Sequence, residues 1–408
     1  MSASTEARPR PKLPLWAIIA TGGAIIGISL GIRHTFGLFL APISQDLGVG
    51  RGAFALAMGL QNILWGVSAP FFGAIADKYG SGRVVVAGAV LYFAGLWLTA
   101  SAGSETDLVL GGVVIGLGVS ASGFTAVLGA VGRAAPPERR QTALALASMA
   151  GSIGQFVALP YAQVLIEGFG WVTAMAVIAV TAGIMVPLAW GIAGKPEAST
   201  DGDTQSLTEA LREAIRNPSF LLLTAGFFVC GFHVVFVGTH LPAFLADQGF
   251  EPWLGAVCLA IIGFVNIIGT YVFGRAGQFK EKRLVLSWLY FARAFVFLGI
   301  LVVPLTVPTV LIFATAIGFL WLGTVPLTSG LVATLFGPRW MSMLFGIVFF
   351  SHQIGSFLGA WLGGYVYDAV QSYDVMWWLS VGLALLAALL HWPIKERPVP
   401  RLAAQEAS

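Results

Sequence analysis

The sequence has little charge. Asp, Glu, Lys and Arg make up only 10% of its 408 residues, whereas soluble proteins contain about 25%. Hydrophobic residues make up 57%, and the mean hydropathy is +0.85. This balance excludes an ordinary water-soluble fold and predicts a membrane protein made of long apolar helices.

Cysteine is also scarce. The two cysteines, Cys230 and Cys258, lie inside apolar runs, and the sequence has no C-x-x-C spacing or Cys/His cluster. A disulfide framework and a structural metal are therefore not expected. The sequence also has no His/Glu metal motif and no nucleophile elbow, so we expect neither an enzyme nor a cofactor. The formal charge of +3 comes from basic residues in loops and does not indicate nucleic acid as a partner.

The apolar segments predict an all-α polytopic protein with twelve transmembrane helices. Only one break is long, and there Ser206 and Glu209 predict a capping box that starts a short amphipathic helix on the membrane surface. No other soluble domain is predicted. We divide the chain into a cytoplasmic tail (1–12), a six-helix half (13–193), a cytoplasmic linker (194–217), a second six-helix half (218–394) and a cytoplasmic tail (395–408).

The basic residues predict the orientation, because Lys and Arg accumulate in cytoplasmic loops. With both termini inside, 19 of the 22 Lys and Arg residues are cytoplasmic, Arg51 is external, and Arg33 and Arg293 lie in the membrane. The 19 Asp and Glu residues then divide into 11 cytoplasmic and 8 external ones. No carboxylate is left for the middle of the membrane. The lack of an N-x-[ST] sequon fits an inner membrane of the bacterial type.

An internal repeat appears at a constant offset of 201 residues. The matching pairs are Gly37 and Gly238, Asp46 and Asp247, Gly48 and Gly249, Gly73 and Gly274, and Gly154 and Gly355. Two halves of like orientation follow, and parallel repeats of this kind place a substrate site between them near the bilayer midplane.

The segment GAIADKYGSGR, which begins at Gly73, resembles the signature G-x-x-x-D-[RK]-x-G-x-[RK] of the major facilitator superfamily. Gly82 stands where the last basic residue is usual. The resemblance implies two six-helix halves with a parallel pseudo-two-fold repeat. It also implies that Asp77 helps to hold the outward-facing state. The conformational gate would consist of Gly73, Asp77, Lys78, Gly80 and Arg83.

A second segment resembles one branch of this superfamily in particular. ERRQTALALASMAGSIG, from Glu138, is similar to R-R-x-x-A-x-G-x-A-x-A-G of monocarboxylate transporters and oxalate/formate exchangers. The helix 4 Arg of proton-coupled drug exporters is replaced by Gly112, which disfavours export of cationic drugs. The helix 8 Asp and Arg of animal monocarboxylate transporters are also absent, so another cation would have to hold a carboxylate.

Arg33 is the leading candidate for that cation, because a charge in the apolar interior needs a partner, a water-filled cavity or a route to the interface. Its planar guanidinium matches a carboxylate, and snorkelling to the outer interface is the structural alternative. Arg293 is a second membrane cation. For it, binding to helix-end carbonyls or packing on Tyr290 and Phe291 is favoured over substrate contact.

Histidine is the side chain that exchanges a proton near neutral pH. We regard His34, His240 and His352 as candidates for proton coupling, with a structural hydrogen bond as the alternative for each. In the superfamily, helices 1, 4, 7 and 10 line the cavity, flanked by 2, 5, 8 and 11. The candidate substrate-binding residues are Arg33, His34, Gln61, Asn62, Thr125, Gln155, His233, Asn266, Thr324, His352 and Gln353. For the amides, hydrogen bonding between helices is the alternative.

The sequence therefore predicts a secondary transporter of a small organic anion, most plainly a monocarboxylate, working as a monomer by proton symport or anion exchange. Its other partner is the lipid bilayer. Two alternatives remain. One is transport of a neutral or amphipathic molecule, with Arg33 and Arg293 structural. The other is a non-transporting sensor, which the lack of any soluble domain beyond the linker disfavours.

Overall fold

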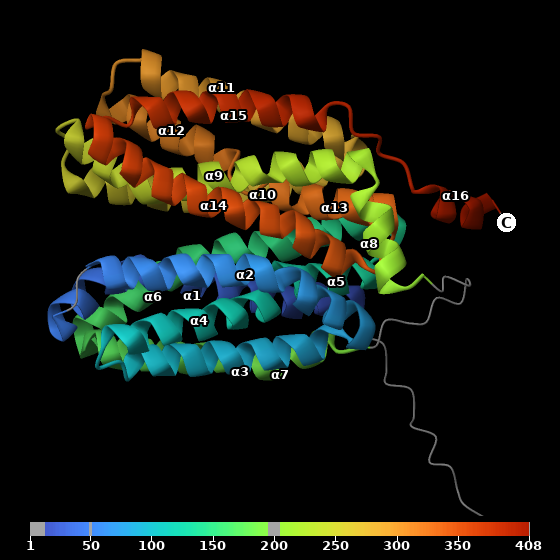
Figure 1. Cartoon of the computed structure of the whole chain (residues 1–408), viewed down its shortest axis with the longest axis horizontal. Helices are drawn as coiled ribbons and strands as arrows, with labels where there is room; N and C mark the ends of the chain where they lie inside the picture. Colours follow the sequence, from blue (N-terminus) through green and yellow to red (C-terminus); the bar gives the residue numbers. More distant parts are fainter. Residues whose placement is uncertain (1–12, 49–50, 195–204, 408) are drawn as a thin grey trace, which may run out of the picture.

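The computed structural model describes residues 13–48, 51–194 and 205–407, and over these ranges the chain is helical, without a strand. The two halves of the sequence form two groups of helices that lie one above the other in Figure 1. In chain order the helices are α1 (Leu15–Leu47), α2 (Arg51–Tyr79), α3 (Ser81–Ala100), α4 (Glu105–Ser122), α5 (Phe124–Ala134), α6 (Pro137–Gly183), α7 (Met185–Leu188), η1 (Ala189–Ile192), α8 (Leu207–Ile215), α9 (Pro218–Asp247), α10 (Pro252–Phe279), α11 (Lys282–Val302), α12 (Val307–Phe319), α13 (Thr324–Phe336), α14 (Met341–Val370), α15 (Asp374–His391) and α16 (Pro400–Ala407).

Within the described residues, ten helical segments are long and apolar enough to cross a membrane. This confirms the prediction of an all-α, multi-pass membrane protein. One of the ten, Pro137–Ile192, has 56 residues. A straight helix of that length would extend about 80 Å, whereas the hydrocarbon core of a bilayer is about 30 Å thick. The helix is interrupted at Gly170, whose φ of 76° and ψ of 165° are not helical and favour glycine.

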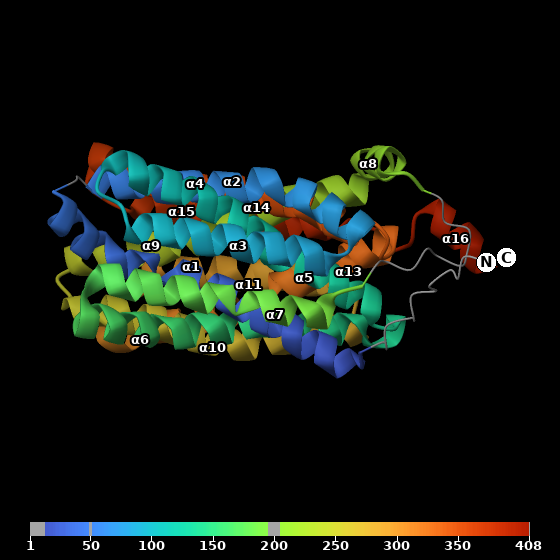
Figure 2. The ribbon, with the colours of Figure 1, turned by 90° about the horizontal axis from the view of Figure 1, so that it is seen from below.

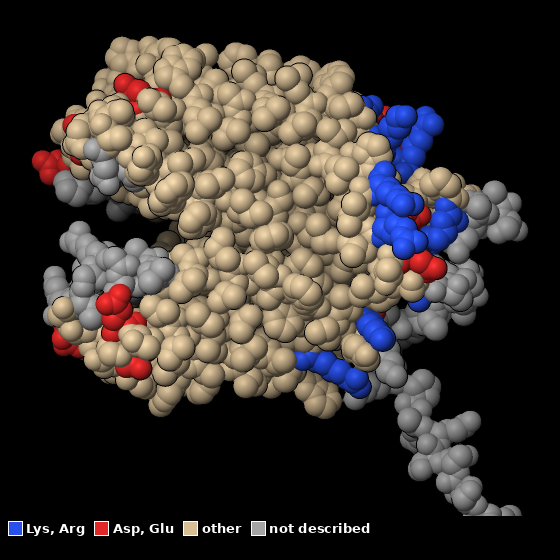
Figure 3. Space-filling view, viewed as in Figure 1, with Lys and Arg blue, Asp and Glu red and all other residues tan. Residues whose placement is uncertain are grey.

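The long helices run side by side, and Figures 1 and 2 show them from two directions. Charged residues gather at the two ends of the bundle. Figure 3 shows Lys and Arg, interspersed with some Asp and Glu, at one end, called the basic end below, and Asp and Glu at the other, the acidic end. In this view the two groups of helices are in contact at the basic end and are separated by a gap at the acidic end.

The helix pairs that approach one another at glycines include α1 with α6 and α9 with α14. A Cβ built on Gly154 of α6 would collide with the backbone of Gly27 in α1, and one built on Gly355 of α14 would collide with the backbone of Phe228 in α9. Small residues at such crossings let helix backbones pack closely in a membrane. These two crossings hold each group of helices together.

We expect Gly154→Ala and Gly355→Ala each to lower the free energy of unfolding by about 1–3 kcal/mol, the usual cost of overpacking. The matched controls are Gly37→Ala and Gly238→Ala, because a Cβ at either position meets nothing within 4 Å. Thermal unfolding of the purified protein measures the effect. Equal melting temperatures for all four variants would contradict the packing described here.

The linker helix and the C-terminal segment meet at the basic end. The Ser206 backbone N–H donates to Glu209 Oε2 at 2.7 Å, and the Glu209 N–H donates to Ser206 Oγ at 3.3 Å, which confirms the predicted capping box. These hydrogen bonds hold the pKa of Glu209 below its usual value. Glu213 of α8 pairs with Arg401 of α16 at 3.6 Å. Residues 1–12 and 195–204, which include the predicted N-terminal tail and part of the linker, lie outside the described residues.

Candidate functional site: a central arginine and a gate at the basic end

Asp77 joins the two groups of helices at the basic end. Its carboxylate accepts hydrogen bonds from the backbone N–H groups of Ser342, at 3.2 Å, and Met343, at 2.8 Å, in the first turn of α14. A carboxylate is favoured there because the N-terminus of a helix carries partial positive charge. Arg133 of α5 forms an ion pair with the same carboxylate and donates to Ser81 Oγ at 2.7 Å. Asp77 is 4% exposed, so water competes little with these bonds.

Close packing and backbone conformation explain why glycine occupies positions 73 and 80 of the predicted gate motif. A Cβ on Gly73 would lie 2.6 Å from the Ser342 carbonyl carbon, so only glycine lets α2 approach α14 here. Gly80 has a φ of 100°, in the region that favours glycine. Lys78 and Arg83 are exposed. The cation that pairs with Asp77 is therefore Arg133, rather than either basic residue of the motif.

Arg33 lies near the middle of α1 and contacts α2. Its Nη2 donates to Asn62 Oδ1 at 2.5 Å, and its guanidinium lies 5.8 Å from the centre of the Trp65 ring. Asn62 is oriented by a second bond, because its Nδ2 donates to the Met58 carbonyl at 3.1 Å. The Arg33 Nε is buried and has no partner among the described residues. Of the two donors on the Nε–Nη2 edge of the guanidinium, only Nη2 thus has a hydrogen-bond partner among the described residues.

The Arg33 partners lie at the contact between the two groups of helices. Gln353 of α14 donates from Nε2 to the Asn62 backbone carbonyl at 3.4 Å, and the Trp65 ring lies 5.0 Å from the ring of Phe349. Figure 1 shows α2 and α14 facing each other across this contact. A change at Asn62 or Trp65 therefore alters a direct contact with the other group of helices.

Of the candidate histidines, His352 is the one that joins this contact. Its Nδ1 lies 3.0 Å from Gln353 Oε1, and its ring stacks on Phe349 at 5.2 Å between centroids. The imidazole is thus linked to Asn62 through a single side chain, Gln353. The His352 side chain is buried.

The other histidines make structural contacts. The His34 Nδ1 lies 2.7 Å from the Leu30 carbonyl of its own helix. The His233 Nε2 lies 3.0 Å from the Ser380 carbonyl of α15, and the His240 Nε2 lies 2.8 Å from the Ala360 carbonyl of α14. His233 and His240 thus connect helices that follow the linker.

Arg293 is fully buried and stabilises a break between α12 and α13. It donates to the backbone carbonyls of Leu320 and Trp321, and its guanidinium lies 5.1 Å from the Tyr290 ring. The carbonyls at the end of α12 have no intrahelical partner, so a cation is favoured there. This is the helix-end role that was favoured over substrate contact.

Of the remaining polar candidates, Asn266 forms a hydrogen bond between the two groups of helices. Asn266 of α10 donates to Ser152 of α6 at 2.7 Å and accepts from Thr270 and the Leu322 N–H, so both its amide nitrogen and its oxygen have partners. Thr324 lies 3.1 Å from Cys230 Sγ. For two candidates, Thr125 and Gln155, the hydrogen bonds are weaker or incomplete. Thr125 makes a long bond of 3.4 Å to the Ser120 carbonyl, and Gln155 has a buried Oε1 without a partner in the described chain.

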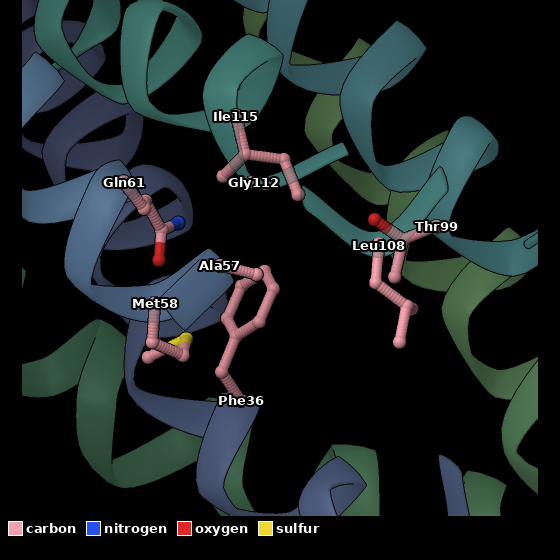
Figure 4. A pocket seen from close by; sticks show the side chains of 8 residues that line it. All are labelled: Phe36, Ala57, Met58, Gln61, Thr99, Leu108, Gly112 and Ile115. Atoms are coloured by element: carbon pink, nitrogen blue, oxygen red, sulfur yellow. The ribbon is translucent and has the colours of Figure 1, made fainter. Parts of the chain in front are cut away.

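Gln61 lines a pocket between α1, α2, α3 and α4. Figure 4 shows its amide directed toward a group of apolar side chains that includes Phe36 and Met58. The side chain is 1% exposed, and neither Nε2 nor Oε1 has a partner among the described residues. A buried amide without a hydrogen-bond partner is costly.

Three residues that contact Asp77 or lie beside Arg33 were not predicted from the sequence: Arg133, Trp65 and Phe349. Arg133 had a detectable signal, because it is a basic residue at the end of the fourth predicted span, on the same side as Asp77. Trp65 and Phe349 had none, since aromatic residues are common in every span.

The family model for the Major Facilitator Superfamily matches residues 19–360, which is more than half of the chain. The chain belongs to this superfamily. Its members are transporters rather than enzymes, and this confirms the resemblance seen in the sequence.

Curated relatives of this superfamily member match along most of its length. Monocarboxylate transporter 13 of Rattus norvegicus is 25% identical over 395 residues, covering 92% of this chain and 89% of that protein. Monocarboxylate transporter 11 of Homo sapiens is 26% identical over 422 residues, covering 95% and 85%. An uncharacterized MFS-type transporter of Bacillus subtilis (strain 168), YcxA, is 24% identical over 383 residues, covering 90% and 91%.

Solved structures agree on the fold. A crystal structure of a variant of the E. coli fucose:proton symporter FucP superimposes with a TM-score of 0.72 at 16% identity, covering 91% of this chain and 97% of that one. A second structure of FucP, described as being in the outward conformation, gives a TM-score of 0.69 at 16% identity, covering 92% and 96%. At this identity the likeness shows the fold alone.

Proposed function

We propose that this superfamily member is a secondary transporter that moves a small organic anion, a monocarboxylate, across the cytoplasmic membrane by alternating access. The observation that carries the proposal is Arg33, an interior cation whose Nε is buried without a partner among the described residues. On the face shown in Figure 3, Asp and Glu lie toward the two ends of the bundle, and Arg33 is not a partner in any of the ion pairs formed by the described residues. The monocarboxylate transporters among the relatives support the same substrate class.

The proposed topology has twelve spans, with both termini in the cytoplasm of a bacterial-type inner membrane. The 56-residue segment Pro137–Ile192 counts as two spans that join at Gly170, and α2 is the remaining span. Lys and Arg mark the cytoplasmic side, so the basic end faces the cytoplasm. Contact at this end and a gap at the acidic end correspond to an outward-facing state, with Asp77 and Arg133 closing the cytoplasmic side.

We also propose that the two groups of helices are two repeated halves related by the offset of 201 residues. The close crossings support this, because Gly27 and Gly154 in the first group are offset by 201 residues from Phe228 and Gly355 in the second. Gly37 and Gly238 are both open to space, as equivalent positions should be. One chain then contains both halves of the site and works as a monomer.

In the proposed mechanism, a substrate carboxylate binds the Nε–Nη2 edge of Arg33, because the planar guanidinium presents two parallel donors to two oxygens. It thereby competes with Asn62 for Nη2. The Asn62 carbonyl is held by Gln353 of the opposite group, so binding alters the contact across which the two groups must rock. Neutralising the interior cation lowers the cost of closing the acidic end over it.

Proton symport would use His352, which is linked to Asn62 through Gln353. In the absence of proton transfer, the same site performs anion exchange, because only the neutralised carrier reorients. The second candidate function is transport of a neutral or amphipathic molecule. The existing Arg33–Asn62 bond favours it, because that bond makes a structural role for Arg33 self-consistent.

Ligand binding distinguishes the two candidates. We expect propionate, lactate and pyruvate to raise the melting temperature of the purified protein, since a ligand that binds only the folded state stabilises it by RT ln(1 + [L]/Kd). The neutral amides of the same acids are the controls. Stabilisation by the amides but not by the acids would contradict the anion proposal and favour the neutral substrate.

A further inference from the structure

A second contact between the two groups of helices lies at the basic end. The first turns of α6 are there, because α6 follows directly after Arg133 of the gate. Gln141 of α6 donates from Nε2 to the Pro326 backbone carbonyl of α13 at 2.8 Å. Gln278 of α10 donates from Nε2 to the Glu138 backbone carbonyl of α6. Each of these two bonds runs from one group of helices to the other.

The Gln141 amide lies between two glycines of the second group. A Cβ built on Gly330 of α13 would collide with Gln141 Oε1, and one built on Gly277 of α10 would lie 3.2 Å from Gln141 Nε2. Gln141 is 4% exposed, so water competes little with its bond to α13. Its Oε1 has no hydrogen-bond partner among the described residues. The amide therefore contributes a donor to this contact and no acceptor.

Gln278 stands 201 residues after Asp77, which is the offset of the proposed repeat. The glycine of the gate motif is kept at this offset, because Gly274 follows Gly73 by 201 residues, and a Cβ on Gly274 would collide with the Ala145 side chain of α6. The acid of the motif is replaced by an amide. The two positions thus make corresponding contacts between the groups with opposite polarity, since Asp77 accepts hydrogen bonds and Gln278 donates one.

The starts of the two helices explain the opposite polarity. Asp77 accepts from two N–H groups in the first turn of α14, where an acid is favoured. The first residue of α6 is Pro137, which has no N–H, and the N–H of Arg139 already donates to a preceding carbonyl at 3.0 Å. The first turn of α6 therefore offers fewer free N–H groups, and Gln278 bonds to the Glu138 carbonyl instead. A carbonyl binds a donor, so an amide suits this position and a carboxylate does not.

We propose that Gln141 and Gln278 form a second, uncharged clamp that holds the basic end closed. The inference rests on the alternating access of the proposed function, and it does not depend on which substrate is carried. When the basic end opens, both amides separate from their carbonyl partners and bind water. An acid at either position then favours the open state, even though an acid at position 278 restores the motif of the first half.

Replacement by glutamate separates this clamp from simple packing. Glutamate keeps the size of glutamine, removes the donor and adds a negative charge that faces a carbonyl oxygen. That charge is poorly solvated when the basic end is closed and hydrated when it is open. The neighbouring cations offer little compensation. Arg139 and Arg275 are exposed, where ion pairs contribute little, and Lys282, beside Gly330, is already paired with Glu396 at 2.6 Å.

The distance between spin labels at Arg83→Cys and Lys280→Cys tests the proposal, because these exposed positions lie on different groups at the basic end. We expect Gln278→Glu to raise the ratio of open to closed molecules about fivefold, the effect of one neutral hydrogen bond. Gln141→Glu should raise it more than about 30-fold, because its charge is more deeply buried in the closed state. The matched control is Gln248→Glu, at an exposed position after α9, which should leave the ratio unchanged.

Asp77→Asn is the reference variant, since it weakens the charged clamp. If Asp77→Asn lengthens the distance and neither glutamate variant does, the second clamp is wrong and the proposed alternating access stands. If none of the three variants changes the distance distribution, the proposed closure of the basic end is wrong as well. Two positions are used because a buried charge at Gln141 can prevent folding, whereas Gln278 is only partly buried. A lower melting temperature of Gln278→Glu with an unchanged distance distribution would show a merely structural role and contradict the inference.

Discussion

Replacement of Arg33 by Gln is expected to reduce counterflow of a labelled monocarboxylate about 100-fold. Glutamine keeps a hydrogen-bond donor for Asn62 but removes the charge and the two-donor edge that would hold a carboxylate. Hydrogen bonds to charged groups contribute about 1.5–3 kcal/mol each, and the loss of one to two of them gives this factor. Arg33→Lys keeps the charge without the planar fork, so an intermediate rate is expected.

The matched control for this result is Arg212→Gln, because Arg212 is exposed on the linker helix at the basic end. Counterflow is measured in proteoliposomes that contain equal amounts of folded protein. If Arg33→Gln transports as fast as the wild type, Arg33 is a structural residue and the anion site must be sought elsewhere.

Asp77→Asn is expected to shift the protein away from the state that is closed at the basic end. Asparagine cannot form the ion pair with Arg133, and it presents one acceptor oxygen where the carboxylate offers two to the N–H groups of Ser342 and Met343. A loss of about 2 kcal/mol changes the equilibrium between the two states about 30-fold. Counterflow should slow, because the loaded carrier must return through the destabilised state.

The distance between the two groups at the basic end reports this shift. Spin labels are placed at Arg83→Cys and Lys280→Cys, which are exposed positions on α3 and at the end of α10. The native cysteines, Cys230 and Cys258, are buried. Asp77→Asn should increase the population with a longer distance, whereas Asp374→Asn at the acidic end should not. An unchanged distance distribution would show that Asp77 does not hold the gate closed.

The sequence predicted the membrane fold, because the length and hydropathy of the spans depend on local composition alone. It also predicted Asp77, because its motif is contiguous. The partner Arg133 was missed because the pair joins residues that are 56 positions apart in the chain. Only the packing of α2 against α5 and α14 brings these groups together.

The roles of the histidines could not be separated from the sequence. His233, His240 and His352 all lie in apolar spans, and the direction of each ring depends on how the helices are rotated about their axes. The structure directs His352 toward Gln353 and the other two toward backbone carbonyls. The pocket at Gln61 was also hidden, because its walls come from four helices. Hydropathy identified Arg33 itself, since an interior charge is rare, but it could not name Asn62 as its partner.

The wild-type arm of the counterflow assay tests the central claim most directly. Proteoliposomes are loaded with one unlabelled monocarboxylate, and the labelled form is added outside at a lower concentration. We expect transient accumulation of label above the level in protein-free vesicles, for at least one short-tailed monocarboxylate and not for its neutral amide. Absence of accumulation for every carboxylate, with folded protein that accumulates a neutral compound, would contradict it.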